Sequence, residues 1–289
     1  MIITNLVGGL GNQMFQYAFG RALALRHGVA LRLDARWFGY YRLHAFALRK
    51  AFALPVEKAR AAELRAVLGW RRPVRVLGVL RRPAFSGLRG ARLLVDDLRQ
   101  APALTVAGAP ATCYLLGYWQ SESYFAAAAG EVRRDFRFPA LDGANRAWAQ
   151  RIGDSIAVSV HVRRADYTDP ATQAVHGLCT PDYYARAMAH VAERAPGAQF
   201  FVFSDDLAWA RAALAIPHRH HFVEGNGPEG NFHDMHLISL CRHHVIANSS
   251  FSWWGAWLCS QAGKIVVAPA RWMARADPPE IVPASWARL

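Results

Sequence analysis

The sequence IAVSVHVRRADY, residues 156–167, joins an apolar β-branched run to two arginines and an aspartate. The run 156–162 is too short for a core helix and has the composition of a strand buried on both faces. Guanidinium groups at the end of a buried strand are unfavourable unless they meet an anion. Because ligands of open α/β sheets bind at the carboxyl ends of the strands, Arg163 and Arg164 are candidates for an anion site. The alternative is that one arginine is solvated and the other pairs with Asp166.

Two other apolar runs in the second half of the chain also end in polar residues. The run 199–203 is followed by SDD at 204–206, and the run 244–247 by NSS at 248–250, close to a helix start. Alternating strands and helices predict a parallel, doubly wound sheet, so all three ends are expected on one edge.

The residue types at these three ends suit a nucleoside diphosphate. Arginine forks bind phosphate bidentately, and serine hydroxyls with the free N–H groups of a helix start bind further phosphate oxygens. A carboxylate at Asp205 is a natural acceptor for the adjacent N–H donors of guanine, which uracil lacks. The alternative for Asp205 and Asp206 is a magnesium site, which is less needed where two arginines already supply positive charge.

The N-terminal segment predicts a strand at 2–7, a glycine turn at 8–11, a helix from Asn12 to His27 and a strand at 29–33. The glycines allow close backbone approach and leave N–H groups at a helix start, although the spacing is neither the dinucleotide fingerprint nor a P-loop. The alternative is that they only form the turn. Asn12 and Gln13 place two amides on the first helical turn.

Length and composition indicate two soluble domains. With 289 residues and a prior of roughly 150 residues per domain, the limits are predicted at 1–150 and 151–289, with boundary composition at 136–143. No run reaches the roughly 18 apolar residues of a membrane span, and the start lacks a basic leader. The four scattered cysteines are expected to be free thiols in a reducing compartment. The chain is therefore expected in the cytoplasm.

Further elements are predicted from periodicity and capping signals. Helices are expected at 57–68, after the cap Thr180 with Pro181, at 207–215, at 232–241 and from 252, and a last strand at 264–268. Ser121 is a further candidate for a helix cap.

The net charge of +13 indicates an acidic partner. Residues 65–92 hold eight arginines and no acid, interleaved with apolar residues. This segment predicts either a basic surface for anionic lipid or a lipid-linked acceptor, or else a solvated arginine-rich helix and loop. Peripheral contact with the inner face of a membrane is thus one expectation. Nucleic acid is not expected as a partner, because the aromatic-and-basic pattern of RNA-binding sheets is absent. The oligomeric state is left open.

Five stretches taken together resemble glycosyltransferase family 11, which comprises inverting α-1,2-fucosyltransferases that use GDP-β-L-fucose. They are GGLGNQMFQYA (8–18), GYWQSESYF (117–125), HVRRADY (161–167), FSDD (203–206) and IANSSFSWWGAWL (246–258). The resemblance runs from about residue 2 to about residue 272. The first and third stretches are also similar to those of α-1,6- and protein O-fucosyltransferases, which share the two-domain GT-B fold and need no metal.

The resemblance implies an α/β GT-B fold, with two Rossmann-like doubly wound domains facing each other across a cleft. It implies an N-terminal acceptor-side domain, a C-terminal GDP-sugar domain, and no cofactor or metal. By similarity Arg163 holds the β-phosphate, with His161 and Asp205 near the guanosine. The remaining candidates line the phosphate and base pocket or the donor sugar; they are Gly9, Gly11, Asn12, Gln13, Arg164, Ser249, Ser250 and Phe251.

The implied reaction moves L-fucose from GDP-fucose to the 2-hydroxyl of a terminal β-galactoside of a glycan, with inversion. Arg163 stabilises the departing diphosphate, and Asn12 and Asp166 complete the predicted catalytic set. Asp166 is the nearest carboxylate, but between two arginines its pKa is depressed, which suits an orienting role as well as that of a base. Asp34 is a rival base. The alternatives are a transferase with another GDP-sugar or acceptor, and a non-enzymatic basic binding module.

Overall fold

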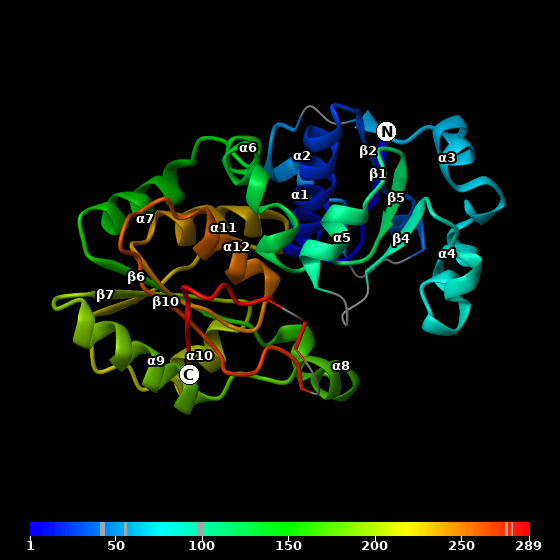
Figure 1. The fold of residues 1–289 in the computed structure, drawn as a ribbon. Helices are drawn as coiled ribbons and strands as arrows, with labels where there is room; N and C mark the ends of the chain where they lie inside the picture. Colours follow the sequence, from blue (N-terminus) through cyan, green and yellow to red (C-terminus); the bar gives the residue numbers. More distant parts are fainter. Residues whose placement is uncertain (41–43, 55–56, 97–100, 275–276, 279) are drawn as a thin grey trace. The chain divides into compact units, whose positions relative to one another are not determined.

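The computed structural model divides the chain into two compact units (Figure 1). It describes residues 1–289 apart from 41–43, 55–56, 97–100, 275–276 and 279, and for residues 165, 166 and 228 it describes the backbone alone. The first unit is Met1–Pro139 with Pro279–Ile281, and the second is Ala140–Pro278 with Val282–Leu289.

The first unit is built on a five-stranded parallel sheet in the order β3-β2-β1-β5-β4. Its strands are β1 (Ile2–Asn5), β2 (Leu31–Asp34), β3 (Glu57–Lys58), β4 (Leu93–Val95) and β5 (Cys113–Leu116). From β1 the chain adds β2 and then β3 on one side. It then forms β4 at the opposite edge of the sheet, and β5 pairs between β4 and β1. The strand order therefore reverses between β1 and β5, the position at which open α/β sheets bind ligands.

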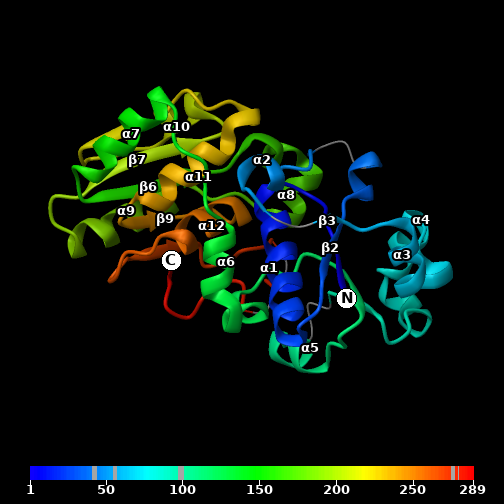
Figure 2. The same ribbon diagram turned by 90° about the horizontal axis from the view of Figure 1, so that it is seen from above.

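Helices cover both faces of this sheet (Figures 1 and 2). Helix α1 (Leu10–His27) lies on one face and packs closely at Gly20, where a Cβ would come within 2.9 Å of Leu31 Cδ1. Helices α3 (Ala61–Leu68) and α4 (Val74–Leu80) cover the other face, burying a core that includes Ile3 and Tyr114. The remaining helices are α2 (Leu48–Ala51), α5 (Pro102–Gly108) and α6 (Ala129–Asp135), with 3-10 turns at Arg36–Gly39, Gly69–Arg71, Pro83–Leu88, Glu122–Tyr124 and Ala126–Ala128.

The second unit is built on a six-stranded parallel sheet in the order β11-β10-β9-β6-β7-β8. Its strands are β6 (Ala157–Val162), β7 (Gln199–Ser204), β8 (His220–Phe222), β9 (His243–Val245), β10 (Val266–Ala268) and β11 (Ala287–Arg288). The chain runs β6, β7, β8 in one direction and then β9, β10, β11 in the other. The strand order therefore reverses between β6 and β9.

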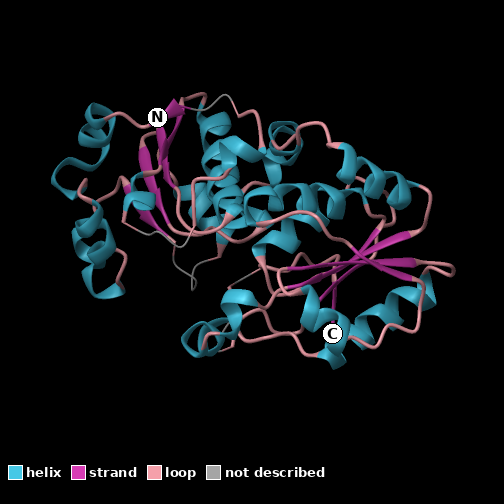
Figure 3. Cartoon of the chain, turned by 180° about the vertical axis from the view of Figure 1, so that it is seen from behind, coloured by secondary structure: helices cyan, strands magenta, loops and turns pink. Residues whose placement is uncertain are grey.

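Alternate side chains of β6 and β7 point to opposite faces of the second sheet, which lies between two helical layers (Figure 3). Val158, Val160 and Val162 pack against α9 (Pro181–Arg194) and α10 (Leu207–Ala213). The side chains that alternate with these point to the other face and pack against the helices of the opposite layer. Those helices are α7 (Gly143–Gly153), α11 (Asn231–Leu240) and α12 (Ser250–Leu258), and α8 (Pro170–His176) and the 3-10 turns Ala165–Thr168 and Pro228–Gly230 complete the unit.

The structure confirms the α/β class with two parallel doubly wound sheets, the Thr180 cap and the free thiols. The units divide after Pro139 and not after residue 150, because Trp148 and Ile152 of α7 pack on the second sheet. None of the helices in the described part of the chain combines the length and apolar character that crossing a bilayer requires.

Three element predictions are wrong in detail. Residues 57 and 58 pair with β2 as strand β3, and the helix begins only at Ala61, where Glu63 Oε2 accepts the N–H of Arg60. Ser121 caps the short turn Glu122–Tyr124 through Ser123 N–H and not the longer helix that follows. The strand at Val266–Ala268 is followed by β11, whose two residues carry too little pattern to be recognised in the sequence.

Candidate functional site

The residues after β6, β7 and β9 lie on one edge of the second sheet. These three strands are adjacent and parallel, so their carboxyl ends point the same way. Arg163 follows β6, Asp205 follows β7, and Ser249 lies four residues beyond β9. The predicted clustering of the three strand ends is thus present, at the reversal of strand order where a ligand crevice is expected.

Arg163 and Asp205 link the ends of two neighbouring strands. Arg163 Nη1 lies 2.8 Å from Asp205 Oδ2, and the backbone N–H of Arg164 donates to Asp205 Oδ1 at 2.8 Å. Both side chains remain partly accessible. Asp205 therefore holds the Arg163 guanidinium in place, and its predicted contact with guanine stays a prediction. The alternative pairing with Asp166 concerns a side chain outside the described residues.

Arg164 is held mainly by an aromatic ring. Its guanidinium carbon lies 3.9 Å from the centroid of the Trp209 ring, and its Nε is 3.8 Å from Asp206 Oδ2. That Nε–H is buried and has no hydrogen-bond partner among the described residues. Asp206 also caps α10 by accepting the N–H of Trp209 at 3.0 Å. Because both Asp205 and Asp206 have arginine partners, the arrangement favours binding of an anion over a magnesium site.

Within the described part of the chain, no three His, Cys, Asp or Glu side chains gather as metal ligands would. The expectation of metal independence stays a prediction, which activity in the presence of a chelator tests.

His161 supplies a neutral ring beside Arg163. It is 6% exposed and stacks on Phe251 with ring centroids 5.3 Å apart. Burial, helped by the charge of Arg163, lowers the pKa of His161 to about 3, so the imidazole is neutral at pH 7. Its Nδ1 is buried, and no described residue forms a hydrogen bond with it. The side chain can therefore exchange a hydrogen bond with a ligand without adding charge.

The lowered pKa of His161 predicts a defined effect of pH on stability. In the unfolded chain His161 binds a proton below about pH 6.5, whereas in the folded protein it does so only below about pH 3. The free energy of unfolding therefore falls as the pH is lowered through this window. Between about pH 6 and pH 4, the free energy of unfolding of the wild type should fall by about 1.4 kcal/mol per pH unit more than that of His161→Asn. Urea unfolding across this range measures the difference, and equal slopes would contradict it.

The start of α12 supplies N–H groups at the same edge. Ser249 is buried and caps the helix by accepting the N–H of Phe251 at 3.3 Å, so the helix begins at Ser250, two residues before the predicted start. Asn248 is occupied by structure, since its Nδ2 donates to His176 O (2.7 Å) and Trp272 O (3.2 Å). The positive end of a helix dipole favours a phosphate at this position.

The glycine turn of the first unit lies at the reversal between β1 and β5. Gly8 has φ of +83°, and a Cβ there would come within 2.7 Å of Asn12 Nδ2, so only glycine fits. Gly9 caps α1, and Gly11 is buried in its first turn. Gln120, in the loop after β5, donates to Asn12 Oδ1 at 2.7 Å. Asn12 is therefore fixed at the carboxyl edge of the first sheet.

Gln13 is a structural residue and not the ligand contact predicted from the sequence. It is completely buried, and its Nε2 donates to Gly8 O (2.8 Å) and Ala45 O (2.9 Å). Its Oε1 accepts the N–H groups of Ala47 (2.9 Å) and Leu48 (3.3 Å). Every polar atom of the amide is thus used to tie the glycine turn to the segment before α2.

Asp34 is not a catalytic base. It is 1% exposed and accepts the hydroxyl of Tyr114 at 2.7 Å. Arg36 donates to both of its carboxylate oxygens, at 2.8 and 2.7 Å. A carboxylate this deeply buried and paired has no access to an acceptor. The side chain of Asp166, the other candidate base, lies outside the part of the chain that the structure describes.

Sequence reasoning did not single out the residues that shape the loop after β5. Asp96 Oδ2 accepts the N–H groups of Tyr118 (3.0 Å) and Trp119 (2.9 Å). A Cβ on Gly117 would lie 2.0 Å from Asp96 Cβ, so this glycine is required for the approach. Trp119 is buried with φ of +57°, an unusual conformation for a large residue. The available signal was Gly117, which stands directly after an apolar run.

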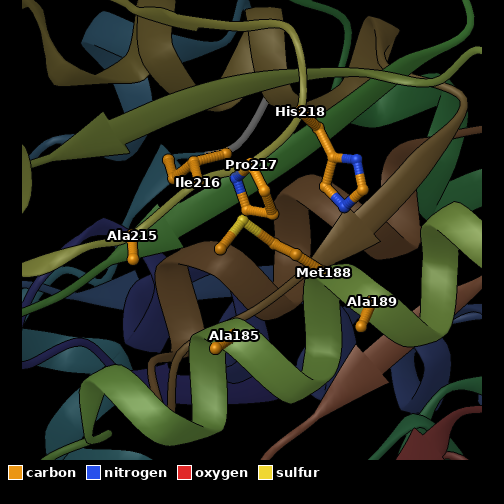
Figure 4. A pocket seen from close by; sticks show the side chains of 7 residues that line it. All are labelled: Ala185, Met188, Ala189, Ala215, Ile216, Pro217 and His218. Carbon is orange, nitrogen blue, oxygen red and sulfur yellow. The ribbon is translucent and has the colours of Figure 1, made fainter.

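An apolar hollow elsewhere in the second unit is not part of this site (Figure 4). It is lined by Ala185, Met188 and Ala189 of α9 and by residues 215–218. Since 215–218 lead into the first residue of β8, the hollow lies at the amino edge of the sheet, opposite the strand ends described above.

Comparisons with known proteins agree with this arrangement. The chain is 32% identical over its whole length to an alpha-1,2-colitosyltransferase of Escherichia coli, of which it covers 99%. It is 38% identical over 45% of its length to the O-antigen biosynthesis glycosyltransferase WbnK of Escherichia coli, of which 44% is aligned.

Solved structures show the same fold. The fucosyltransferase NodZ from Bradyrhizobium superposes with a TM-score of 0.53 at 16% identity, over 88% of this chain and 91% of that one. A variant of Arabidopsis thaliana FUT1 in complex with GDP gives 0.55 at 13% identity, over 92% and 70%. These likenesses confirm the GT-B class. The family model for glycosyl transferase family 11 matches residues 97–279, and together with the full-length similarity this shows that the chain is a glycosyltransferase that belongs to family 11.

Proposed function

We propose that the protein is an inverting α-1,2-glycosyltransferase that uses a GDP-activated sugar. In its most specific form, L-fucose passes from GDP-β-L-fucose to the 2-hydroxyl of a terminal β-galactoside of a glycan. Family membership supports sugar transfer, and the full-length similarity to an alpha-1,2-colitosyltransferase supports the linkage and the class of donor. The non-enzymatic binding module suggested by the net charge is set aside on the same ground.

The observation that carries the proposal is the Arg163–Asp205 pair beside the start of α12. A guanidinium anchored by a carboxylate is oriented before the ligand arrives, and its N–H donors lie in one plane. A helix start at the same edge adds a second group that favours phosphate oxygens. A diphosphate carries oxygens for both groups.

The reaction makes one bond and breaks one bond at the anomeric carbon of the donor sugar. The acceptor 2-oxygen attacks C1 from the face opposite the diphosphate, the C1–O bond to the β-phosphate breaks, and the hydroxyl proton is released. Negative charge therefore grows on the departing GDP. Arg163 and the positive end of the α12 dipole are proposed to stabilise that charge.

The remaining roles are proposals of the same kind. His161 and Phe251, which stack on each other, are proposed to lie against the guanosine. Asn12 is proposed to face the donor sugar. Asp166 is proposed either as the base or as an orienting partner of an arginine, and an early departure of GDP reduces the base strength that the acceptor hydroxyl needs.

Product analysis with lactose tests donor, linkage and metal dependence together. We expect turnover of GDP-fucose with lactose to give an α-1,2-linked fucoside, no turnover of UDP-galactose, and the same rate in the presence of EDTA. GDP-mannose serves as a second guanosine donor with a different sugar. Turnover of UDP-galactose, or complete loss of activity in EDTA, would contradict the proposal.

Colitose is a second candidate for the transferred sugar, because the relative aligned over the whole chain is a colitosyltransferase. Colitose is L-fucose without its 3-hydroxyl. A site that hydrogen-bonds this hydroxyl rejects the analogue that lacks it by a factor of about 10⁴. Rates with GDP-fucose and GDP-colitose, measured side by side, decide between the two sugars, and a preference for GDP-colitose would replace fucose in the proposal.

A further inference from the structure

The segment 65–92 forms one outer surface of the first unit, here called the arginine surface. It comprises the end of α3, the turn Gly69–Arg71, helix α4 and the turn Pro83–Leu88. Val67, Leu68, Val74, Leu77 and Leu80 are buried, several of them against the sheet on the face opposite α1, whereas residues 81–88 are exposed; the ribbon of the segment is seen in Figures 1 and 2.

Large apolar side chains are exposed on this surface. Trp70 is 59% exposed, Val79 42%, Phe85 36% and Leu88 50%. They are four of the nine large apolar side chains that are exposed among the described residues. A helix and loop that are only solvated by water do not account for so many exposed apolar side chains. Exposed apolar groups that lie on one surface mark a contact site.

The charges on the same surface are not balanced. None of the eight arginines between residues 65 and 92 forms a salt bridge with a described residue. Three of them donate to backbone carbonyls, which leave the charge in place: Arg71 to Leu88 O, Arg89 to Leu80 O and Arg92 to Ala66 O. Exposed arginines of the second unit, such as Arg186 and Arg194, have carboxylate partners instead.

A hollow of about 400 Å³ opens within this basic surface, between the end of α3 and the turn before β4. Four arginines line it: Arg65, Arg71, Arg89 and Arg92. The exposed residues Trp70 and Leu88 directly precede Arg71 and Arg89 in the chain, so exposed apolar residues are interleaved along the segment with arginines that line the hollow. A phospholipid carries the complementary groups: a phosphate that guanidinium groups bind, and acyl chains that contact apolar side chains.

We propose that the arginine surface docks the protein on a bilayer that contains anionic phospholipid. Trp70, Phe85 and Leu88 enter the headgroup region, and the arginines bind lipid phosphates. A membrane fits better than a nucleic acid, because bases would stack only on the rings of Trp70 and Phe85, whereas an acyl chain also contacts the exposed aliphatic groups of Val79 and Leu88. The inference goes beyond the proposed function and does not depend on it, since neither donor nor acceptor takes part.

Sedimentation of the full chain with lipid vesicles tests this inference. We expect binding to vesicles of phosphatidylcholine with phosphatidylglycerol and little binding to phosphatidylcholine alone. Arg72→Gln/Arg75→Gln should weaken the binding by about fivefold for each arginine removed. Trp70→Ser/Leu88→Ser should weaken it by tenfold or more, because most of the apolar contact is lost.

Matched variants elsewhere in the first unit provide the controls. Arg49→Gln/Arg137→Gln removes the same charge from exposed positions outside the arginine surface, and Leu104→Ser removes an apolar group that is 64% exposed. Both should bind vesicles like the wild type. All the changed side chains are exposed, and far-UV circular dichroism confirms that each variant is folded.

Three results would overturn the proposal: equal binding to neutral vesicles, equal loss in the control variants, or no effect of Trp70→Ser/Leu88→Ser. The last result would mean that the basic surface is attracted to any polyanion. In that case a parallel titration would show that the protein binds heparin as strongly as anionic vesicles. Sugar transfer to soluble lactose should be unchanged in the arginine-surface variants, so the docking proposal can fail while the proposed function stands.

Discussion

Arg163→Ala should lower the rate of sugar transfer by about a hundredfold to a thousandfold, which corresponds to about 3–4 kcal/mol of transition-state stabilisation. The guanidinium, held by Asp205 at 2.8 Å, is proposed to meet the charge that grows on the departing GDP. Steady-state rates with GDP-fucose and lactose measure the loss. Arg163→Lys should recover only part of the rate, since a single ammonium group cannot replace a planar fork with several donors.

A matched change on the same unit separates this effect from a general loss of positive charge. Arg186 is exposed on α9 and pairs with Asp182, so Arg186→Ala should leave the rate near that of the wild type. Thermal unfolding of both variants shows whether they remain folded. A folded Arg163→Ala protein with a rate within about threefold of the wild type, well short of the expected loss, would rule out the leaving-group role.

Gln13→Ala should destabilise the first unit by about 3 kcal/mol or more, because it leaves several buried backbone groups without a hydrogen-bond partner. The four bonds of this amide fix Gly8 against the segment before α2. Urea unfolding measures the change. The structural role predicts that activity falls in step with the folded fraction.

Gln120→Ala is the control for this prediction, since that half-buried amide makes a single bond to Asn12 and should cost about 1 kcal/mol. The opposite pattern, a fully stable Gln13→Ala protein with no turnover, would restore Gln13 to the ligand-binding role that the sequence suggested.

The position of the second-unit site could be predicted from the sequence for a definite physical reason. Apolar strand segments end abruptly in polar residues, and parallel strands bring all their carboxyl ends to one edge. Residue type then limits the chemistry. Arg163 and Ser249 could therefore be selected as candidate phosphate-binding residues before any of their contacts was known. The Arg163–Asp205 pair was not foreseen, because it depends on β6 and β7 being neighbours in the sheet.

The errors concern residues whose partners are distant in the sequence. Gln13 carries an amide at a helix start, which suits a ligand contact equally well until the loop at 45–48 is placed against it. Asp34 ends an apolar run as Asp205 nearly does, but the hydroxyl of Tyr114, 80 residues away, donates to it in the buried interior. Strands β3 and β11, of two residues each, form only because a neighbouring strand offers free backbone groups.

The arginine surface illustrates a different limit. The sequence shows eight arginines among apolar residues, but it does not show which apolar side chains reach the core. Leu77 and Leu80 are buried, whereas Val79, on the same helix, is exposed. Exposure depends on how α4 meets the sheet, and only the fold supplies that information.

Titration of GDP by calorimetry, without an acceptor, tests the central claim that the ends of β6, β7 and β9 bind a guanosine diphosphate. The wild type should bind GDP more tightly than UDP, and Arg163→Ala should weaken GDP binding by about tenfold or more, since a hydrogen bond to a charged group contributes about 1.5–3 kcal/mol. Arg186→Ala should bind GDP like the wild type. Equal affinity of Arg163→Ala and the wild type for GDP would contradict the account.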